Sequence, residues 1–149
     1  TVRDNLVWLM RVHGMGKSDA ISHANGLLAG AGLDHLADRP ALTLSAGEQA
    51  ILGLARGLVM QPRLVLLDEP TAHLDPRATK SVEEVISDMR KRGLGILMTT
   101  HDFGQARRLA EQVVIMVGGK VVEAGPAAEV LTNPKSQDAA AFLAGELVS

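Results

Sequence analysis

The sequence predicts an α/β fold in which a helical region precedes a mainly parallel sheet flanked by helices. From residue 19 to residue 60, apolar residues recur with the spacing of helices that bury one face. After residue 62 the pattern changes to short runs that are apolar on both faces, which is typical of strands buried in a parallel sheet. We therefore expect a helical subdomain over residues 1–61 and an α/β subdomain over residues 62–149.

Each expected element has a local signal. The helical region has two apolar faces, formed by Ala20, Ala24 and Leu28 and by Leu52, Ala55 and Val59. Strands are expected at 64–67, 96–98 and 113–117, and the helices between them at 78–92 and 103–111. Gly118-Gly119 predicts a two-residue hairpin turn, so the last strand should pair antiparallel. Two Ala-rich helices, 127–131 and 138–147, should follow. Trp8 should be buried, and the methionines, including Met60, Met89 and Met98, should fill the core.

The composition favours a folded domain without the usual nucleic-acid or metal sites. Of its 149 residues, 46% are hydrophobic, which is enough to build a core. The formal net charge of −2 gives no basic surface for nucleic acid, and there is no cysteine for disulfides or thiolate ligands. The five histidines lack the short spacing of a zinc motif. No stretch reaches the roughly 20 apolar residues that cross a bilayer, so work at a membrane would require a partner.

The strongest chemical signal is a pair of carboxylates, Asp68 and Glu69, directly after the apolar run 64–67. Parallel sheets place their ligands at the carboxyl ends of strands, and carboxylates buried there need a cation or hydrogen bonds to compensate them. Hydrolysis of a Mg-nucleotide uses such a pair. Asp68 would hold Mg²⁺, directly or through water, and Glu69 would polarise the attacking water. The alternative is a strand end followed by an acidic turn.

Further polar motifs lie on either side of this pair. The upstream motif begins an expected helix and comprises Ser45, Ala46, Gly47, Glu48 and Gln49. Its hydroxyl and free backbone N–H groups form a ready anion site. Downstream, Asp75 follows closely, and the strand 96–98 leads to His101. Each of these residues also has a purely structural interpretation. Ser45 and Asp75 could serve as helix caps and nothing more, and His101 could be an ordinary, partly buried histidine.

Together and in this order, the motifs resemble those of ABC-type ATPases. Residues 44–49 resemble the L-S-G-G-Q/E signature, with Ala46 in place of the first glycine, and residues 64–69 resemble the Walker B strand with its catalytic Glu. Leu74-Asp75 is similar to the end of the D-loop, and His101 to the switch His. The resemblance implies the C-terminal part of a P-loop NTPase of ABC type, with ATP and Mg²⁺ as cofactors.

The family's Walker A loop and Q-loop Gln cannot be assigned in this sequence. Gly14-Met15-Gly16-Lys17-Ser18 ends like a Walker A loop, but the pattern requires Gly at position 11, where the chain has Arg11. The segment also lies in the helical region before the signature, whereas the family's loop precedes that region. We therefore expect Lys17 to be a solvated loop residue, Ser18 to be a helix cap, and the chain to be truncated at its N-terminus.

The resemblance implies part of an ATP-binding and ATP-hydrolysing subunit that couples hydrolysis to solute import. Two subunits would form a head-to-tail homodimer, in which Glu69 and His101 act in cis. The signature residues 45–49 and Asp75 would contact ATP, partly in trans, and Asp68 would hold Mg²⁺. A transmembrane permease and a solute-binding protein are the implied partners, and the inner, cytoplasmic face of the cell membrane is the implied location. The chain alone should be inactive.

Two other functions stay open. The chain could be a non-hydrolysing regulatory or docking module derived from an ABC ATPase. It could also belong to a soluble ABC-type ATPase of DNA repair or translation, although the short helical region without insertions argues against this. A phosphate-binding loop encoded upstream of Thr1 would favour the transport ATPase, and a start codon there would favour the docking module.

Overall fold

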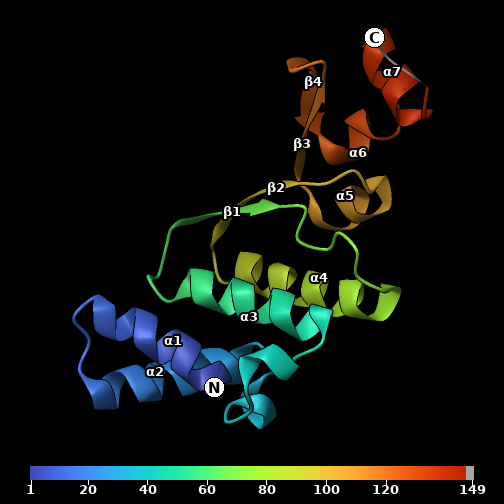
Figure 1. Cartoon of the computed structure of the whole chain (residues 1–149). Helices are drawn as coiled ribbons and strands as arrows, with labels where there is room; N and C mark the ends of the chain where they lie inside the picture. The colour runs from blue at the N-terminus through green and yellow to red at the C-terminus, as the bar shows by residue number, and fades with distance from the viewer. Residues whose placement is uncertain (147–149) are drawn as a thin grey trace. The chain divides into compact units, whose positions relative to one another are not determined.

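The structure is a computed structural model that describes residues 1–146, and the chain forms two compact units, Thr1–Thr99 and Thr100–Ser149 (Figure 1). Within the first unit, helix α3 (Ala46–Leu58) packs against helix α4 (Pro76–Lys91). This contact crosses the predicted boundary at residue 61, because α3 precedes it and α4 follows it. The predicted subdomains 1–61 and 62–149 therefore stay a prediction, since compactness divides the chain after Thr99 instead.

The first unit begins with two helices that pack together, α1 (Val2–Val12) and α2 (Lys17–Gly30). Each buries small and aliphatic residues four positions apart, which are Val2, Leu6 and Met10 on α1 and Ala20, Ala24 and Leu28 on α2. Short 3-10 turns, η1 (Asp34–Leu36) and η2 (Ala41–Thr43), lead to α3. The predicted apolar face of α2 is therefore confirmed.

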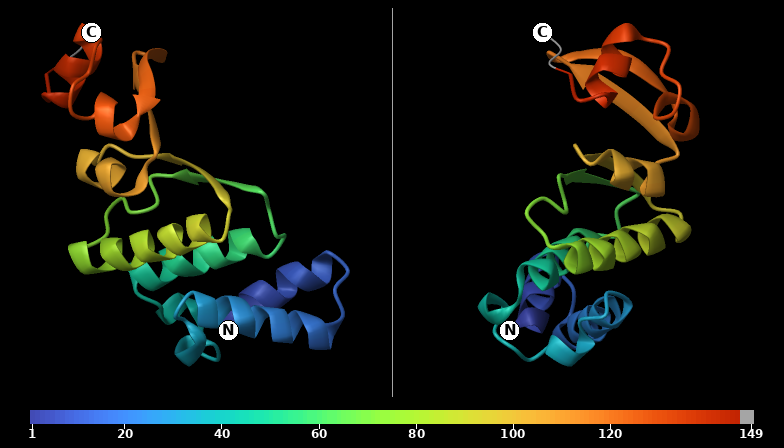
Figure 2. Two further views of the ribbon diagram at one scale, coloured as in Figure 1. Left: turned by 180° about the vertical axis from the view of Figure 1, so that it is seen from behind. Right: turned by 90° about the vertical axis from the view of Figure 1, so that its right-hand side faces the viewer.

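Helices α3 and α4 form the middle of the first unit. They lie side by side between the α1–α2 pair and a strand pair, as the views in Figures 1 and 2 agree. Strand β1 (Leu64–Asp68) pairs in parallel with β2 (Gly95–Thr99), so that Asp68 lies opposite Thr99. Because α4 connects the two strands, this is a βαβ unit, as the alternation of apolar runs and helices predicts.

Within residues 100–146, the second unit contains a β-hairpin and three short helices. Its elements are α5 (Phe103–Leu109), β3 (Gln112–Val117), β4 (Lys120–Pro126), α6 (Ala127–Val130) and α7 (Gln137–Leu143). Gly118 and Gly119 have φ angles of 54° and 77°, the left-handed pair that a tight hairpin turn requires. The antiparallel hairpin is confirmed. The predicted end of the last helix, Leu147, lies outside the described residues.

Two predictions of burial are wrong. Trp8 is 64% exposed and Met60 is 55% exposed. In α1 the buried residues are Leu6 and Met10, and a residue two positions away points about 200° around the helix, toward the opposite face. Met60 lies after the C-cap of α3, Val59, where the helix no longer holds it against the core.

The strand pair is also less buried than the sequence predicts. Leu64, Leu66 and Leu97 are exposed, and Leu66 reaches 69%. Within residues 1–146 the sheet that contains them has two strands, and helices cover one face of it. The run 64–67, which the sequence predicts to be buried on both faces, is therefore half-buried on one face and exposed on the other in this part of the chain.

Candidate functional site

Asp68 and Glu69 lie where β1 ends and the chain turns away from the sheet. Asp68 is the last residue of the strand and is exposed, whereas Glu69 is half-buried. Glu69 has φ 46°, in the left-handed region that non-glycine residues adopt only when their surroundings hold them there. Its backbone N–H donates to the Thr99 carbonyl oxygen at 3.2 Å. The bond across to β2 thus fixes the direction in which the chain leaves the strand.

Thr99 joins the two carboxylate residues, and the sequence predictions missed it. Its hydroxyl donates to Asp68 Oδ1 and accepts from the Glu69 backbone N–H at 3.1 Å. The structure therefore brings Asp68, Glu69 and Thr99 together at one edge of the β1–β2 pair. The only signal in the sequence is that Thr99 follows an apolar run, as Asp68 does. Strand register, which local patterns do not give, makes the two residues neighbours.

The signature residues form the start of α3. Ser45 is the N-cap, and with Glu48 it makes a capping box. The Ser45 backbone N–H and hydroxyl donate to Glu48 Oε2 at 2.7 and 2.8 Å, and the Glu48 N–H donates to Ser45 Oγ at 3.4 Å. These bonds, the backbone one first, hold the pKa of the Glu48 carboxyl below its ordinary value. The anion site stays a prediction, and an anion there would compete with Glu48 for the Ser45 hydroxyl.

Neighbouring signature residues pack the helix into the first unit. Leu44 is buried, and its carbonyl oxygen accepts from Gln49 Nε2 at 2.9 Å. Gly47 is buried where α3 meets the first turn of α4, and a Cβ added to it would lie 2.7 Å from the Ala78 Cβ. No Cβ fits at that distance, so the close approach of the two helices explains a glycine at this position.

Asp75 begins α4 beside this contact. It is the N-cap, and its Oδ1 accepts from the backbone N–H groups of Arg77 and Ala78 at 2.9 and 3.0 Å. Pro76 occupies the first helical position, which suits a residue that lacks an N–H. The capping role is confirmed. Through Ala78, the first turn of the helix that Asp75 caps packs against Gly47.

Gly47→Ala should destabilise the first unit by about 1–3 kcal/mol, because the new methyl group overpacks the contact with Ala78. Urea unfolding followed by circular dichroism measures the change. Gly53→Ala is the matched control: Gly53 lies in the same helix with no heavy atom within 4 Å of an added Cβ, and it should gain about 0.5–1 kcal/mol. Adding Ala78→Gly to Gly47→Ala should remove part of the loss. Equal effects of Gly47→Ala with and without Ala78→Gly would contradict this explanation.

His101 lies in the second unit, just before α5. It is exposed and stands between Thr100 and Asp102. The Asp102 backbone N–H donates to Thr100 Oγ1 at 3.0 Å, and Asp102 in turn caps α5 by accepting from the Gln105 N–H at 3.0 Å. These bonds shape the backbone on either side of His101. Its role beside Glu69 stays a prediction.

The segment 14–18 is the connection between α1 and α2. Lys17 is exposed, as predicted, but it is the first residue of α2 and not a loop residue, so that part of the prediction is wrong. The prediction for Ser18 is wrong, because the N-cap is Gly16 and Ser18 lies inside the first turn. Gly14 has φ 90°, which only glycine adopts readily. The segment is a helix-to-helix turn and does not follow a strand, as a phosphate-binding loop does.

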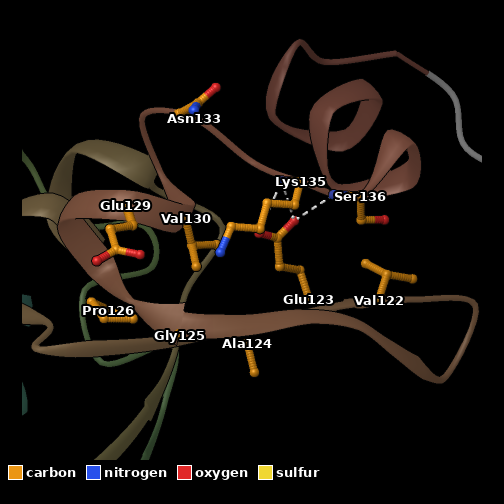
Figure 3. A pocket seen from close by; sticks show the side chains of 10 residues that line it. All are labelled: Val122, Glu123, Ala124, Gly125, Pro126, Glu129, Val130, Asn133, Lys135 and Ser136. Atoms are coloured by element: carbon orange, nitrogen blue, oxygen red, sulfur yellow. Dashed lines mark hydrogen bonds between the residues drawn. The ribbon is translucent and has the colours of Figure 1, made fainter.

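A shallow pocket of about 320 Å³ lies in the second unit, between β4 and the segment that leads to α7 (Figure 3). The Glu123 carboxylate accepts the backbone N–H groups of Lys135 at 3.0 Å and Ser136 at 2.9 Å. These two bonds, the one from Ser136 first, hold the pKa of the Glu123 carboxyl below its ordinary value. Since Ser136 is the N-cap of α7, Glu123 ties that helix to the hairpin. The central carboxylate of the pocket therefore has a structural role, because its hydrogen bonds hold two elements together.

Residues 1–146 offer neither a cluster of metal ligands nor a membrane-spanning helix. No group of three or more His, Cys, Asp or Glu side chains is placed to hold a metal ion within that range. Nor does any helix there combine the length and apolar character that crossing a bilayer requires.

Comparison with known proteins gives the family. A family model described as ABC transporter matches residues 1–72, which include the signature and Asp68-Glu69. The chain belongs to the ABC transporter family of ATP-binding domains. The ABC protein cbiO1 from Clostridium perfringens, part of the transporter complex cbiONQ, has the same fold: TM-score 0.82 at 28% identity, over 89% of this chain and 53% of that one. The predicted fold class is therefore confirmed.

Two relatives of this ABC domain have importer or transport names. The phosphate import ATP-binding protein PstB 2 of Natronomonas pharaonis is 45% identical over 117 residues, which are 78% of this chain and 41% of that protein. The arginine transport ATP-binding protein ArgV of Corynebacterium glutamicum is 40% identical over 148 residues, 99% of this chain and 58% of that protein. The chain thus spans between two fifths and three fifths of the length of these relatives.

Proposed function

We propose that this chain supplies the hydrolytic and signature elements of an ATP-hydrolysing subunit that drives solute import. The observation that carries the proposal is the pair Asp68-Glu69 at the carboxyl end of β1, with Glu69 held in a left-handed turn by Thr99. The name of PstB 2 supports import as the direction of transport, and the name of ArgV supports a role in solute transport. The chain differs in sequence from both, so the solute itself is left open.

The carboxylates suit the two roles proposed for them. Asp68 is exposed, and one of its oxygens bonds to the Thr99 hydroxyl, which leaves the other to face Mg²⁺ or a Mg-bound water. Bound Mg²⁺ supplies positive charge against the β- and γ-phosphates. Glu69 is the proposed base that orients and polarises the attacking water. His101 is proposed as the second catalytic residue.

The remaining site residues are proposed to contact ATP, partly across a dimer. Ser45, Ala46 and Gly47 lie at the N-terminus of α3, where the helix dipole and backbone N–H groups favour an anion. In a head-to-tail homodimer this terminus would meet the γ-phosphate held by the second subunit. Glu48 and Gln49 stabilise that terminus through their bonds to Ser45 and Leu44, and Asp75 is proposed to line the same interface.

A permease and a solute-binding protein are the further proposed partners. Such a subunit would bind peripherally to the permease at the cytoplasmic face of the membrane. Closing the dimer on ATP and opening it after hydrolysis would shift the permease between its two states.

Phosphate release by a protein that joins this chain to an upstream phosphate-binding half tests the proposal. We expect ATP hydrolysis that requires Mg²⁺ and stops when EDTA removes the metal. A folded protein that binds Mg-ATP but releases no phosphate would contradict the proposal and favour the non-hydrolysing docking module.

A further inference from the structure

We propose that Thr99 is a positioning residue for hydrolysis: its hydroxyl fixes Asp68 and Glu69 relative to each other. The inference rests on the proposed function of the two carboxylates. It concerns a residue on the neighbouring strand that has no chemistry of its own in the reaction.

The strand register places Thr99 where one hydroxyl can reach both residues. Asp68 and Thr99 are partners in the parallel β1–β2 ladder, and Glu69 is the next residue of the chain. A threonine hydroxyl offers one donor and can accept as well. Here it donates to Asp68 Oδ1 at 2.5 Å and accepts from the Glu69 N–H at 3.1 Å. Both capacities are therefore used at the site.

The bond to Asp68 restrains the proposed metal-binding carboxylate. The Thr99 hydroxyl donates this bond to Asp68 Oδ1, and a hydrogen bond to a charged carboxylate is stronger than one between neutral groups. Because Oδ1 is held, rotation of the carboxylate about its terminal bond is restricted. The other oxygen then keeps one direction, which is what a Mg²⁺ site with near-ideal geometry requires.

The bond from Glu69 restrains the proposed general base. Its N–H is shared between two oxygens of Thr99, the carbonyl at 3.2 Å and the hydroxyl at 3.1 Å. The shared bond holds the left-handed φ of 46° at Glu69, a conformation that costs free energy for a residue with a side chain. The backbone direction at Glu69 decides where its carboxylate points. Loss of the hydroxyl should therefore loosen both carboxylates at once.

Two substitutions separate the hydroxyl from the shape of the side chain. Thr99→Val keeps the β-branched shape, which suits a strand, but removes both bonds of the hydroxyl. Thr99→Ser keeps the hydroxyl and removes the methyl group. Thr99 is exposed, so neither change opens a cavity in the core. If only the packing of Thr99 mattered, Val would be the better replacement. Under the proposal Ser is the better one.

The first measurement is hydrogen exchange of the Glu69 amide by NMR, without nucleotide, in a protein that joins this chain to a phosphate-binding half. Thr99→Val should speed exchange by roughly 2- to 10-fold, the factor that one net hydrogen bond gives, whereas Thr99→Ser should stay near wild type. The amide of Leu66, in the middle of β1, is the internal control and should not change. Unchanged exchange at Glu69 in Thr99→Val would overturn the inference.

The second measurement is steady-state ATP hydrolysis by the same proteins. Thr99→Val should lower kcat roughly 10-fold or more with little change in KM, because misplaced reacting groups slow the chemical step more than they weaken binding. Thr99→Ser should recover most of the loss. Wild-type kcat in Thr99→Val would overturn the inference even if exchange increased. An inactive wild-type protein would instead count against the proposed function, and the exchange experiment would still decide the role of Thr99.

Discussion

Glu69→Gln is expected to lower ATP turnover by roughly 100-fold or more in a protein that joins this chain to a phosphate-binding loop. The amide keeps the shape of the side chain and its place after β1, but it cannot accept a proton from the attacking water. ATP binding should be retained, since Glu69 is proposed to act on the water and not on the nucleotide. Phosphate release at saturating Mg-ATP measures the loss, and titration with ATP measures the affinity.

Glu84→Gln provides the matched control for this experiment. Glu84 is exposed on α4, so replacing it with Gln removes the same charge at a position away from the end of β1. It should leave turnover near wild type. Gel filtration adds a second readout. With ATP, Glu69→Gln should stay a closed dimer because it does not hydrolyse the nucleotide, and this dimer should elute earlier than the monomer. Equal turnover in wild type and Glu69→Gln would remove Glu69 from the proposed mechanism.

The elements with strong local signals could be predicted from the sequence. Ser45 and Asp75 cap their helices as expected, since a short polar side chain before a helical pattern satisfies free N–H groups wherever the helix lies. Gly118-Gly119 gives a hairpin for a similarly local reason, because both positions need positive φ. Such features depend on a few consecutive residues and not on the rest of the fold.

Contacts between distant segments could not be predicted in the same way. The Thr99 bonds depend on the register of β1 with β2, and the glycine at 47 depends on how closely α3 approaches α4. Neither is a property of one segment. Trp8 is a different case, because its exposure could be predicted from the sequence. It is two positions from both Leu6 and Met10, a spacing that puts it on the opposite face of a helix. The general preference of large apolar residues for the core does not hold for every such residue, and Trp8 is an exception.

The 149-residue chain alone is expected neither to bind Mg-ATP with useful affinity nor to hydrolyse it. Its sequence contains no G-x-x-x-x-G-K-[ST] motif, whose backbone N–H groups and Lys hold the β- and γ-phosphates. Asp68 and Glu69 would repel a bare nucleotide. The exposed apolar residues Leu64, Leu66 and Leu97 add a second expectation, that the isolated chain self-associates or is only marginally stable.

The central claim is that this chain supplies hydrolytic residues but depends on a separate half to bind ATP. Isothermal titration of the purified 149-residue chain with Mg-ATP, together with a phosphate-release assay, tests this claim most directly. The same chain joined to a phosphate-binding half serves as the positive control. We predict no measurable heat of binding and no phosphate release for the chain alone, with both restored in the joined protein. Micromolar binding and Glu69-dependent turnover by the chain alone would contradict the account, and residues 14–18 would then be the first place to look for a phosphate site.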